Sequence, residues 1–385
     1  MRVAVLGTGL IGRMITRELA ASPVIEEVVA VDSAPEAVER AVRGLPGHRA
    51  RGRVVDLGQP GALVELLKDF DAAVAALPHA LSMAANEAAV AARCHLVDLV
   101  GSRYPEKLRL HEPATEAGVL LVTGCGVAPG IVNVLAARGI ELLDEAHEAI
   151  IYCGGLPRRP QPPLHYQVVF RLESVMGLYT RPATAAENGE IVQLPPLSGL
   201  ETVRFPEPVG VCEAAYSDAH STAYTLRHKV RRLAEKTVRY PGHFAKMGVL
   251  AELGFLDEEP VVVGGQPVVP RRAAMAVLEP QLRGESEQDV TVARVVVRGV
   301  RDGRAVRHEW TMVDLYDEER GYTSMAKTTG FPAVIVTEWL AQGRLPERGF
   351  LAPEQLLAGD RFDPFLAALR ERGVVIDYAR HDGAA

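Results

Sequence analysis

The first 32 residues constrain the fold most, because they place a glycine-rich turn between an apolar strand and a helix. Val3-Ala4-Val5-Leu6 predicts the strand, and Gly7-Thr8-Gly9-Leu10-Ile11-Gly12 follows it directly. A second apolar strand, predicted at 28–31, ends at Asp32. A G-x-G-x-x-G motif alone is a weak signal, but this strand–turn–helix–strand setting indicates a dinucleotide-binding Rossmann unit.

Each residue of the motif has a physical reason for its place. Gly7 permits the tight turn, Gly9 lets the backbone approach a pyrophosphate, and Gly12 allows close packing of helix on strand. The backbone N–H groups at the start of the helix, which include those of Thr8, Leu10 and Ile11, are expected to bind an anion. The Asp32 carboxylate would accept hydrogen bonds from ribose hydroxyls and repel a 2′-phosphate, which predicts NAD rather than NADP. Arg13 or Arg40 could compensate for that charge.

Strands and helices continue to alternate up to about residue 127. The apolar patterns predict strands at 53–56, 72–77, 95–99 and 119–123, and helices at 62–70, 81–92 and 107–117. This repetition predicts an α/β fold, with an N-terminal Rossmann domain, a doubly wound parallel sheet, over residues 1–127.

Ligands of such sheets bind beyond the carboxyl ends of the strands, so residues at those ends are candidates for the site. Asp56 is expected to face the adenine, and Leu77-Pro78 the nicotinamide half. Asp98 would receive a substrate ammonium or orient a water, and Cys125 would line the site. For three of them the sequence leaves a structural alternative open: Pro78 as the end of a strand, Asp98 as the cap of a turn, and Cys125 as a small packed apolar group.

From about residue 128 the pattern changes to that of an α+β domain, expected over 128–330 as the substrate-binding and dimerisation domain. One helix at 131–143 is followed by predicted strands at 149–153 and 166–170, and by a hairpin formed from 290–298 and 307–316. The C-terminal segment, about 331–385, is expected to return to the first domain.

The composition excludes several classes of function. The chain has 385 residues and a net charge of −7, so no overall basic field favours nucleic acid or an anionic membrane. No apolar run reaches the roughly 18 residues of a membrane span, and the first strand opens without a leader, which predicts a cytoplasmic protein. Four scattered cysteines and eleven scattered histidines form no metal-binding pattern, so no metal is expected.

Several motifs beyond the Rossmann unit carry a resemblance to a known family. Cys153-Gly154-Gly155-Leu156-Pro157 and Val238-Arg239-Tyr240-Pro241-Gly242-His243 are the most distinctive. Shorter matching segments lie in order at 98–101, 124–130, 328–332 and 348–354. The chain resembles the saccharopine dehydrogenase family, and within it the branch that contains L-lysine 6-dehydrogenase.

This resemblance implies NAD(P)-linked oxidation of a C–N bond in an amino acid. For lysine, oxidation would give the ε-imine, and water would then release ammonia and the 6-semialdehyde. A saccharopine or carboxynorspermidine-type dehydrogenase is the alternative, and a catalytically silent NAD-binding regulatory protein is the alternative from another class. The partners expected are a small amino-acid substrate and a second copy of the chain, because the family's second domain commonly carries a dimer contact.

The second domain supplies the candidates for substrate binding. Arg239 is the expected clamp for the substrate carboxylate, with a surface arginine as its alternative. His243 is the leading candidate for the general base, although it could instead cap the helix that follows. The second-line candidates are Tyr240, Thr329 and the glycines Gly154 and Gly155. Arg171 stands where the relatives usually have a serine, and would either contact a second carboxylate or face solvent.

Overall fold

The computed structural model describes residues 1–168, 172–283, 286 and 288–383. The chain divides into two compact units: unit 1 is Met1–Arg138 with Ala326–Val374, and unit 2 is Gly139–Met325 with Val375–Ala385. The sequence predicts a boundary at 127/128, whereas this division follows Arg138. Residues 375–383, expected with unit 1, belong instead to unit 2, because 377–382 form a strand of its sheet.

Unit 1 is built on a seven-stranded parallel sheet in the order β17-β6-β5-β4-β1-β2-β3. Its strands are β1 (Arg2–Leu6), β2 (Glu27–Asp32), β3 (Ala50–Val54), β4 (Ala72–Ala75), β5 (His95–Asp98), β6 (Leu120–Thr123) and β17 (Gly349–Leu351). The central strands are buried on both faces, as their continuous apolar sequences require. The predicted doubly wound sheet is confirmed.

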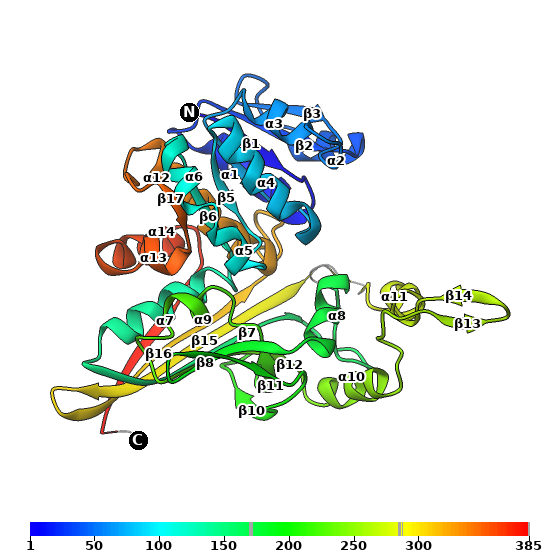
Figure 1. Cartoon of the computed structure of the whole chain (residues 1–385), viewed down its shortest axis with the longest axis vertical. Helices are drawn as coiled ribbons and strands as arrows, with labels where there is room; N and C mark the ends of the chain where they lie inside the picture. Colours follow the sequence, from blue (N-terminus) through cyan, green and yellow to red (C-terminus); the bar gives the residue numbers. More distant parts are fainter. Residues whose placement is uncertain (169–171, 284–285, 287, 384–385) are drawn as a thin grey trace. The chain divides into compact units, whose positions relative to one another are not determined.

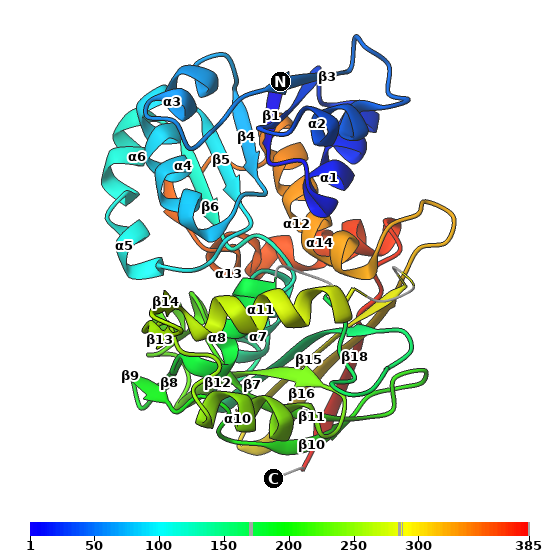
Figure 2. The same ribbon diagram turned by 90° about the vertical axis from the view of Figure 1, so that its right-hand side faces the viewer.

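Helices cover both faces of this sheet (Figure 1). In Figure 2, α3, α4 and α6 lie on one side, and α1, α2 and α12 lie on the other. The bounds are α1 (Leu10–Ala21), α2 (Pro35–Val42), α3 (Ala62–Leu67), α4 (His79–Ala92), α5 (Tyr104–Leu108), α6 (His111–Ala117), α12 (Ser324–Ala341), α13 (Pro353–Leu357) and α14 (Phe362–Glu371). The close approach of α12 to α1 occurs at Gly330, where an added Cβ would lie 2.2 Å from Cε of Met14.

The strand order reverses between β1 and β4, which are neighbours although β2 and β3 lie between them in sequence. The chain leaves β1 toward one edge and returns to β4 toward the other. Sheets of this kind bind ligands at the carboxyl ends of the strands where the order reverses, so the ends of β1 and β4 are the expected place for one.

Unit 2 is a mixed sheet of nine strands with helices packed on it. Its main path is β10-β11-β12-β7-β15-β16-β18, and β8 and β9 continue from β12. The strands are β7 (Glu145–Pro157), β8 (Ala183–Glu187), β9 (Glu190–Leu194), β10 (Glu201–Arg204), β11 (Val211–Ser217), β12 (Arg232–Arg239), β15 (Asp289–Arg301), β16 (Arg304–Leu315) and β18 (Asp377–Asp382). β7 pairs parallel with β12 and antiparallel with β15.

The described residues of unit 2 also form helices and a separate hairpin outside its main sheet. The helices are α8 (Leu172–Thr180), α9 (Thr222–Thr225), α10 (His243–Glu252) and α11 (Pro270–Gln281), and the hairpin is β13 (Val261–Val263) with β14 (Gln266–Val268). α7 (Ile131–Glu141) contributes its end: at Gly139 an added Cβ would lie 2.5 Å from Cγ2 of Val297 on β15. No described helix is long and apolar enough to cross a membrane.

Some local expectations are confirmed and others are wrong. The predicted hairpin is confirmed as β15 and β16, joined by the turn at Asp302-Gly303. The strand predicted at 166–170 does not form over the described residues 166–168, and 169–170 lie outside the described chain. The basic run at 227–232 lies after the short α9 and leads by turns into β12.

Candidate active site

The glycine turn after β1 is tightly packed at two of its three glycines. Gly7 has φ +86°, and a Cβ there would lie 2.5 Å from the carbonyl oxygen of Ala76. A Cβ on Gly12 would lie 1.9 Å from the carbonyl oxygen of Gly7, so only glycine allows α1 to start so close to the turn. These two positions serve the fold itself, before any ligand is considered.

Gly9 differs, because no described atom lies within 4 Å of the Cβ it lacks. It is the N-cap of α1, and the described first turn of that helix carries neither a capping side chain nor an acidic residue. The start of α1 therefore offers N–H groups and a positive dipole end beside open space. This arrangement fits the pyrophosphate of a dinucleotide.

Asp32 at the end of β2 fastens the glycine turn. Its Oδ2 accepts hydrogen bonds from the Thr8 N–H at 2.8 Å and the Thr8 hydroxyl at 3.2 Å, and Oδ1 accepts from the Ala34 N–H at 3.1 Å. Burial raises the pKa of Asp32, but these hydrogen bonds outweigh it and lower the pKa below the usual value. The carboxylate is therefore ionised, with further lone pairs available to ribose hydroxyls.

The other predicted cofactor residues follow neighbouring strands. Leu77 reaches Gly7, with its Cδ2 3.5 Å from the position of the missing Cβ, and Pro78 is the N-cap of α4. Leu10 is 37% exposed at the start of α1, and Ile11 follows it. Asp56 lies beyond β3, where it accepts from the Gly58 N–H and the Gln59 side chain, and these hydrogen bonds lower its pKa.

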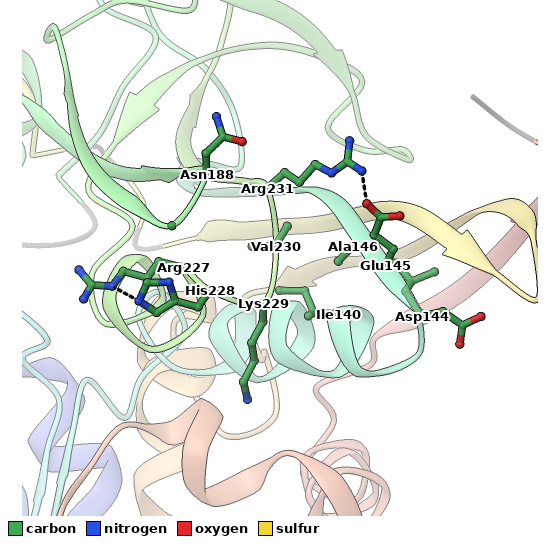
Figure 3. A pocket seen from close by; sticks show the side chains of 12 residues that line it. Ile140, Asp144, Glu145, Ala146, Asn188, Arg227, His228, Lys229, Val230 and Arg231 are labelled. Carbon is green, nitrogen blue, oxygen red and sulfur yellow. Dashed lines mark hydrogen bonds and ion pairs between the residues drawn. The ribbon is translucent and has the colours of Figure 1, made fainter.

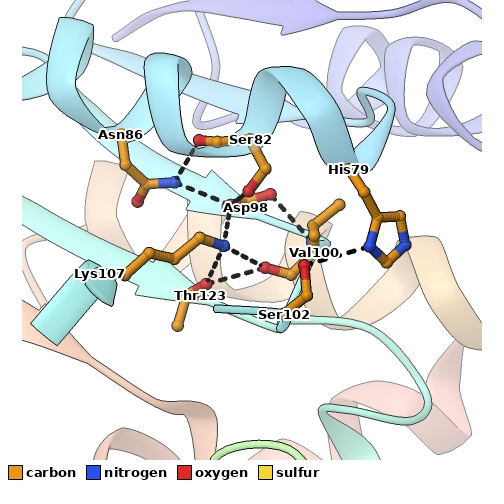
Figure 4. Close-up of polar contacts among 8 residues, drawn as sticks. All are labelled: His79, Ser82, Asn86, Asp98, Val100, Ser102, Lys107 and Thr123. Atoms are coloured by element: carbon orange, nitrogen blue, oxygen red, sulfur yellow. Dashed lines mark hydrogen bonds and ion pairs between the residues drawn. The ribbon is translucent and has the colours of Figure 1, made fainter. Parts of the chain in front are cut away.

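Asp98 is fully buried at the centre of a polar cluster at the end of β5 (Figure 4). Its Oδ2 accepts from Ser82 Oγ at 2.6 Å, Asn86 Nδ2 at 2.8 Å and Lys107 Nζ at 2.9 Å. Its Oδ1 accepts from the Val100 N–H at 2.9 Å. The carboxylate thus accepts hydrogen bonds from four protein donors. This geometry favours a structural role for Asp98 over the predicted contact with substrate.

Lys107 is the cation of this cluster, with a side chain 1% exposed. Besides Asp98, its ammonium donates to the Val100 carbonyl at 2.6 Å and to Thr123 Oγ1 at 3.0 Å. Burial lowers the pKa of Lys107, and the adjacent Asp98 charge opposes that shift. The pair therefore joins the carboxyl ends of β5 and β6.

Cys125 and Thr329 lie near the loop that follows β6. Cys125 is fully buried, its N–H donates to the Asp98 carbonyl, and burial raises the pKa of its thiol. A protonated, enclosed thiol is a small apolar group and not a reactive one, which favours the packing alternative for Cys125 over a place in the lining of the site. Thr329 is half-buried on α12, and its methyl group lies 3.1 Å from the position of a Cβ on Gly126.

In unit 2, Arg239 ends β12 and is only 4% exposed. Its Nη1 donates to the Val238 carbonyl at 2.8 Å, and its guanidinium lies over the Tyr166 ring, 4.9 Å from the centroid. Among the described residues its Nε has no hydrogen-bond partner. These observations exclude the alternative that Arg239 is a surface arginine. Its guanidinium is buried, and its hydrogen-bonding capacity is only partly used.

His243, the predicted base, is buried at the start of α10. Its Nδ1 lies 2.9 Å from the Leu164 carbonyl oxygen, and its Nε2 lies 2.7 Å from the Tyr179 hydroxyl. A carbonyl only accepts, so Nδ1 carries the proton and Nε2 accepts from Tyr179. Burial and then the Arg239 charge lower the pKa of His243 to about 3. The neutral ring is therefore occupied on both nitrogens, which does not favour it as the base.

His243 does not cap its own helix either. Glu213 on β11 accepts from the Gly242 N–H at 3.0 Å and from the Phe244 N–H at 2.7 Å. This carboxylate satisfies the start of α10.

The other predicted site residues of unit 2 do not all lie on the face of the sheet that carries Arg239. Tyr240 packs in the apolar cluster with Val238, and its hydroxyl donates to the Pro157 carbonyl at 3.3 Å, so it points away from the Arg239 face. Gly154 makes room for β12, since a Cβ there would lie 2.5 Å from the Val238 carbonyl oxygen. Gly155 pairs with Thr291. Arg171 lies outside the described residues.

Sequence reasoning missed Glu235, which lies on β12 four residues before Arg239. Side chains alternate along a strand, so Glu235, Thr237 and Arg239 share one face of the sheet. Glu235 is 5% exposed, and its Oε2 has no hydrogen-bond partner in the described part of the chain. The spacing Glu-x-Thr-x-Arg within an apolar stretch was the available signal, but it is visible only once 232–239 is taken as a strand.

A pocket of about 370 Å³ lies elsewhere in unit 2 (Figure 3). Its lining combines the end of α7 and the start of β7 with the basic run before β12, and its Arg231 is paired with Glu145. None of the predicted site residues lines it, so we do not assign the substrate to it. The described residues contain no cluster of three or more side chains suited to hold a metal ion.

Comparison with known proteins identifies the family to which these two units belong. Residues 3–122 match the model of the saccharopine dehydrogenase NADP binding domain, and residues 126–374 match that of the saccharopine dehydrogenase C-terminal domain. The chain belongs to the saccharopine dehydrogenase family.

Relatives of known name share modest identity over nearly the whole chain. The saccharopine dehydrogenase (NADP+, L-glutamate-forming) of Schizosaccharomyces pombe is 23% identical over 420 residues, covering 88% of this chain and 90% of that protein. The carboxyaminopropylagmatine dehydrogenase of Synechocystis is 24% identical over 398 residues, covering 97% and 96%. The apo structure of saccharopine dehydrogenase (L-Glu forming) from Saccharomyces cerevisiae aligns with a TM-score of 0.80 at 20% identity, covering 99% of each chain.

The family confirms an oxidoreductase with a Rossmann NAD(P)-binding unit and a second, mixed-sheet unit. A homospermidine synthase of Legionella pneumophila in complex with NAD shares the fold, with a TM-score of 0.66, 11% identity and coverage of 98% and 91%. Because names in this group include both nucleotides, the choice between NAD and NADP rests on residues of this chain.

The contrast between Gly9 and Gly12 yields a first prediction. Gly9→Ala places a methyl group in the open space at the start of α1, so we expect a folded protein whose dinucleotide affinity falls roughly 10–100-fold. Gly12→Ala, by contrast, meets backbone and should lower the free energy of unfolding by roughly 1–3 kcal/mol or more. Calorimetric titration and urea unfolding separate the two effects. If a folded Gly9→Ala protein bound the nucleotide with unchanged affinity, the start of α1 would not be the anion-binding site.

The buried cluster yields a second prediction. Lys107→Met leaves Asp98 buried beside three neutral donors and no cation, so we expect the free energy of unfolding to fall by about 3–5 kcal/mol. Lys68→Met is the matched control, because Lys68 forms an exposed pair with Glu65 and its loss should change stability by less than about 1 kcal/mol. Equal urea midpoints for the two variants would show that Lys107 does not support the fold.

Proposed function

We propose that this protein is an NAD-dependent dehydrogenase that oxidises a C–N bond of an amino acid, with L-lysine as the first candidate substrate. The products would be NADH, ammonia and the 6-semialdehyde. The single observation that supports this most strongly is the buried, incompletely satisfied guanidinium of Arg239 in the second unit, because such a group fits a substrate carboxylate.

Asp32 supports NAD as the cofactor. Its carboxylate is ionised at the end of β2, and neither Arg13 nor Arg40 forms an ion pair with it among the described contacts. A 2′-phosphate at this point would therefore meet uncompensated negative charge. The printed names of several relatives specify NADP, so this chain is proposed to differ from them.

The charges on β12 support free lysine. A free amino acid with a terminal amine needs one carboxylate clamp and one anionic group for its ammonium. Arg239 supplies the cation for the carboxylate, and the carboxyl group of Glu235, on the same face of the same strand, supplies oxygens for the amine. A saccharopine-type adduct would keep the amine and carry further carboxylates, so it would need further cationic groups.

The second candidate function is oxidation of a secondary amine, as in saccharopine or a carboxynorspermidine-type adduct. The names of two relatives, a saccharopine dehydrogenase and a carboxyaminopropylagmatine dehydrogenase, favour it. Such adducts of larger size need further polar contacts, for which Arg171 is a sequence candidate. A non-catalytic NAD-binding regulator remains the alternative from another class.

The chain's own groups have distinct tasks in the proposed reaction. The start of α1 would hold the pyrophosphate, and Asp32 would hold the adenosine ribose. Arg239 would fix the substrate carboxylate, so that the orientation of the remaining chain is set from one end. When bound, the nicotinamide supplies the hydride acceptor for the reaction. The Tyr179–His243 hydrogen bond would hold Tyr179 beside Arg239.

Two further expectations from the sequence stay predictions. These are assembly of the chain with a second copy and a cytoplasmic location. Light scattering on the purified protein measures the mass of the assembly directly.

A third prediction tests the function as a whole. Purified protein is mixed with NAD or NADP and with L-lysine, saccharopine, L-norleucine or a diamine without a carboxylate, and NADH or NADPH absorbance is followed. We expect turnover with L-lysine and a preference for NAD that Asp32→Ala reduces. Nucleotide binding by calorimetry without turnover of any C–N substrate would instead support the regulatory alternative.

The fourth prediction concerns the carboxylate clamp. Arg239→Lys keeps the charge but loses the planar fork, so KM for L-lysine should rise roughly 10–100-fold with little change in kcat. Arg232→Ala is the control, because that arginine lies on the same strand but is paired with Glu148. A KM that stays within twofold of the wild-type value in Arg239→Lys would refute the clamp.

A further inference from the structure

Buried polar atoms without partners gather on one face of the unit 2 sheet. They are Ser217 Oγ on β11, Glu235 Oε2 and Arg239 Nε on β12, and Thr291 Oγ1 on β15, each unpartnered among the described residues. Strand register places all four on the face that carries Cys153 of β7. Native proteins leave few buried polar groups unsatisfied, so a group of four on one face indicates a polar ligand.

Ser217 lies directly across from Glu235 in the register of β11 and β12. Beyond Ser217, Asp218 is the charged group that acts on Glu235, and its own side chain is 42% exposed. Burial and then the Asp218 charge hold the pKa of Glu235 well above its usual range. Burial and the Asp218 charge therefore favour the protonated form of Glu235, so its carboxylate accepts a proton readily.

Glu235 and Arg239 are suitably spaced for the two ends of one extended small molecule. Residues four apart on a strand have Cα atoms about 13 Å apart. Both side chains are long and can reach toward each other, which leaves room for a chain of several methylene groups between a carboxylate and an amine. Cys153 pairs with Thr237 in the register of β12 and β7, so it lies between Glu235 and Arg239 along the strand direction, and burial raises the pKa of its thiol.

We propose that Glu235 binds the reacting amine of the substrate and accepts its proton, while Arg239 holds the carboxylate at the other end. This inference rests on the proposed function and extends it to the residue that performs the proton transfer. It also commits to an aliphatic chain with a carboxylate at one end and an amine at the other, as in L-lysine, because Arg239 fits the carboxylate and Glu235 the amine.

The proton transfer precedes the oxidation. The substrate ammonium passes one proton to the Glu235 carboxylate, which becomes a neutral acid, and the amine regains its lone pair. A hydride, with both electrons of the C–H bond, then leaves the adjacent carbon for NAD+, and the lone pair forms the C=N bond of the iminium ion. The substrate loses two electrons and NAD+ gains them. Glu235 afterwards returns its proton to solvent on the side of half-exposed Asp218.

The other candidates for this role are less suited to it. Asp98 is saturated by four donors, and His243 is neutral with both ring nitrogens in use. Glu213, a carboxylate of this face near Arg239, caps α10. Asp289 of β15 lies on the same face, and its two oxygens accept from the Ser324 and Met325 N–H groups. Glu235 is the remaining buried carboxylate on β12 with an unoccupied oxygen.

Recognition of the amine is tested first, without turnover. The full-length protein is titrated by calorimetry with L-lysine and with L-norleucine, which has the same carbon chain but no terminal amine. We expect wild-type protein to bind L-lysine at least about 10-fold more tightly, which corresponds to one charge-assisted hydrogen bond. Glu235→Gln should remove this preference while affinity for L-norleucine stays unchanged.

The proton transfer is tested by pH profiles. In Glu235→Gln we expect kcat for L-lysine at neutral pH to fall roughly 10²–10⁴-fold. Wild-type kcat/KM should fall as pH is lowered through the pKa of Glu235, because the protonated acid cannot accept a proton. The variant depends on free amine from solution, so its deficit should shrink as pH approaches the ε-amine pKa of about 10.4.

Controls separate a chemical role from a structural one. Glu190→Gln changes an exposed glutamate on β9 and should leave binding, kcat and pH profile unchanged. Thermal unfolding of Glu235→Gln should show no loss of stability, because an uncharged amide replaces a buried acid. The proposal is overturned if wild-type protein binds L-lysine no better than L-norleucine, or if Glu235→Gln keeps the wild-type preference or pH profile. Turnover of another amine with an unchanged Glu235→Gln rate overturns this inference and leaves the proposed oxidation standing.

Discussion

The organisation of unit 1 depends on the buried carboxylate of Asp98. One side chain receives donors from α4, from the loop after β5 and from α5, and the ammonium from α5 also reaches Thr123 on β6. A charge taken out of water this completely is tolerated only when every lone pair has a donor. These contacts hold the carboxyl ends of β5 and β6 together. The predicted cofactor-binding residues also follow the carboxyl ends of strands of this sheet.

Unit 2 depends on a different constraint, which is that successive side chains of β12 point to opposite faces of the sheet. This alternation places Lys236 on one face, where it pairs with Glu201. It places both Glu235 and Arg239 on the other face. A shift of register by one residue would exchange these sets and leave both charged groups on the wrong side of the sheet. Pairing with β7 and β11 along nearly the full length of β12 prevents that shift.

Much of unit 1 could be predicted from the sequence, because its signals are local. The glycine turn, Asp32 and the buried parallel strands each depend on neighbours within about thirty residues. The roles of Asp98 and His243 could not be predicted in this way. Whether an acid or an imidazole is free to react depends on partners such as Lys107 and Tyr179, which packing alone brings into contact. Glu235 was missed for a related reason, since its significance depends on strand register.

The division of the chain into units has a practical consequence for work with fragments. The seventh strand of the first sheet is β17, at 349–351, and the last strand of the second is β18, at 377–382. The polypeptide passes from one unit to the other three times, after residues 138, 325 and 374. No single cut therefore yields either unit intact, and a C-terminal deletion of a few dozen residues exposes a sheet edge in both. Genetic dissection of this protein calls for point substitutions or spliced linkers rather than truncation.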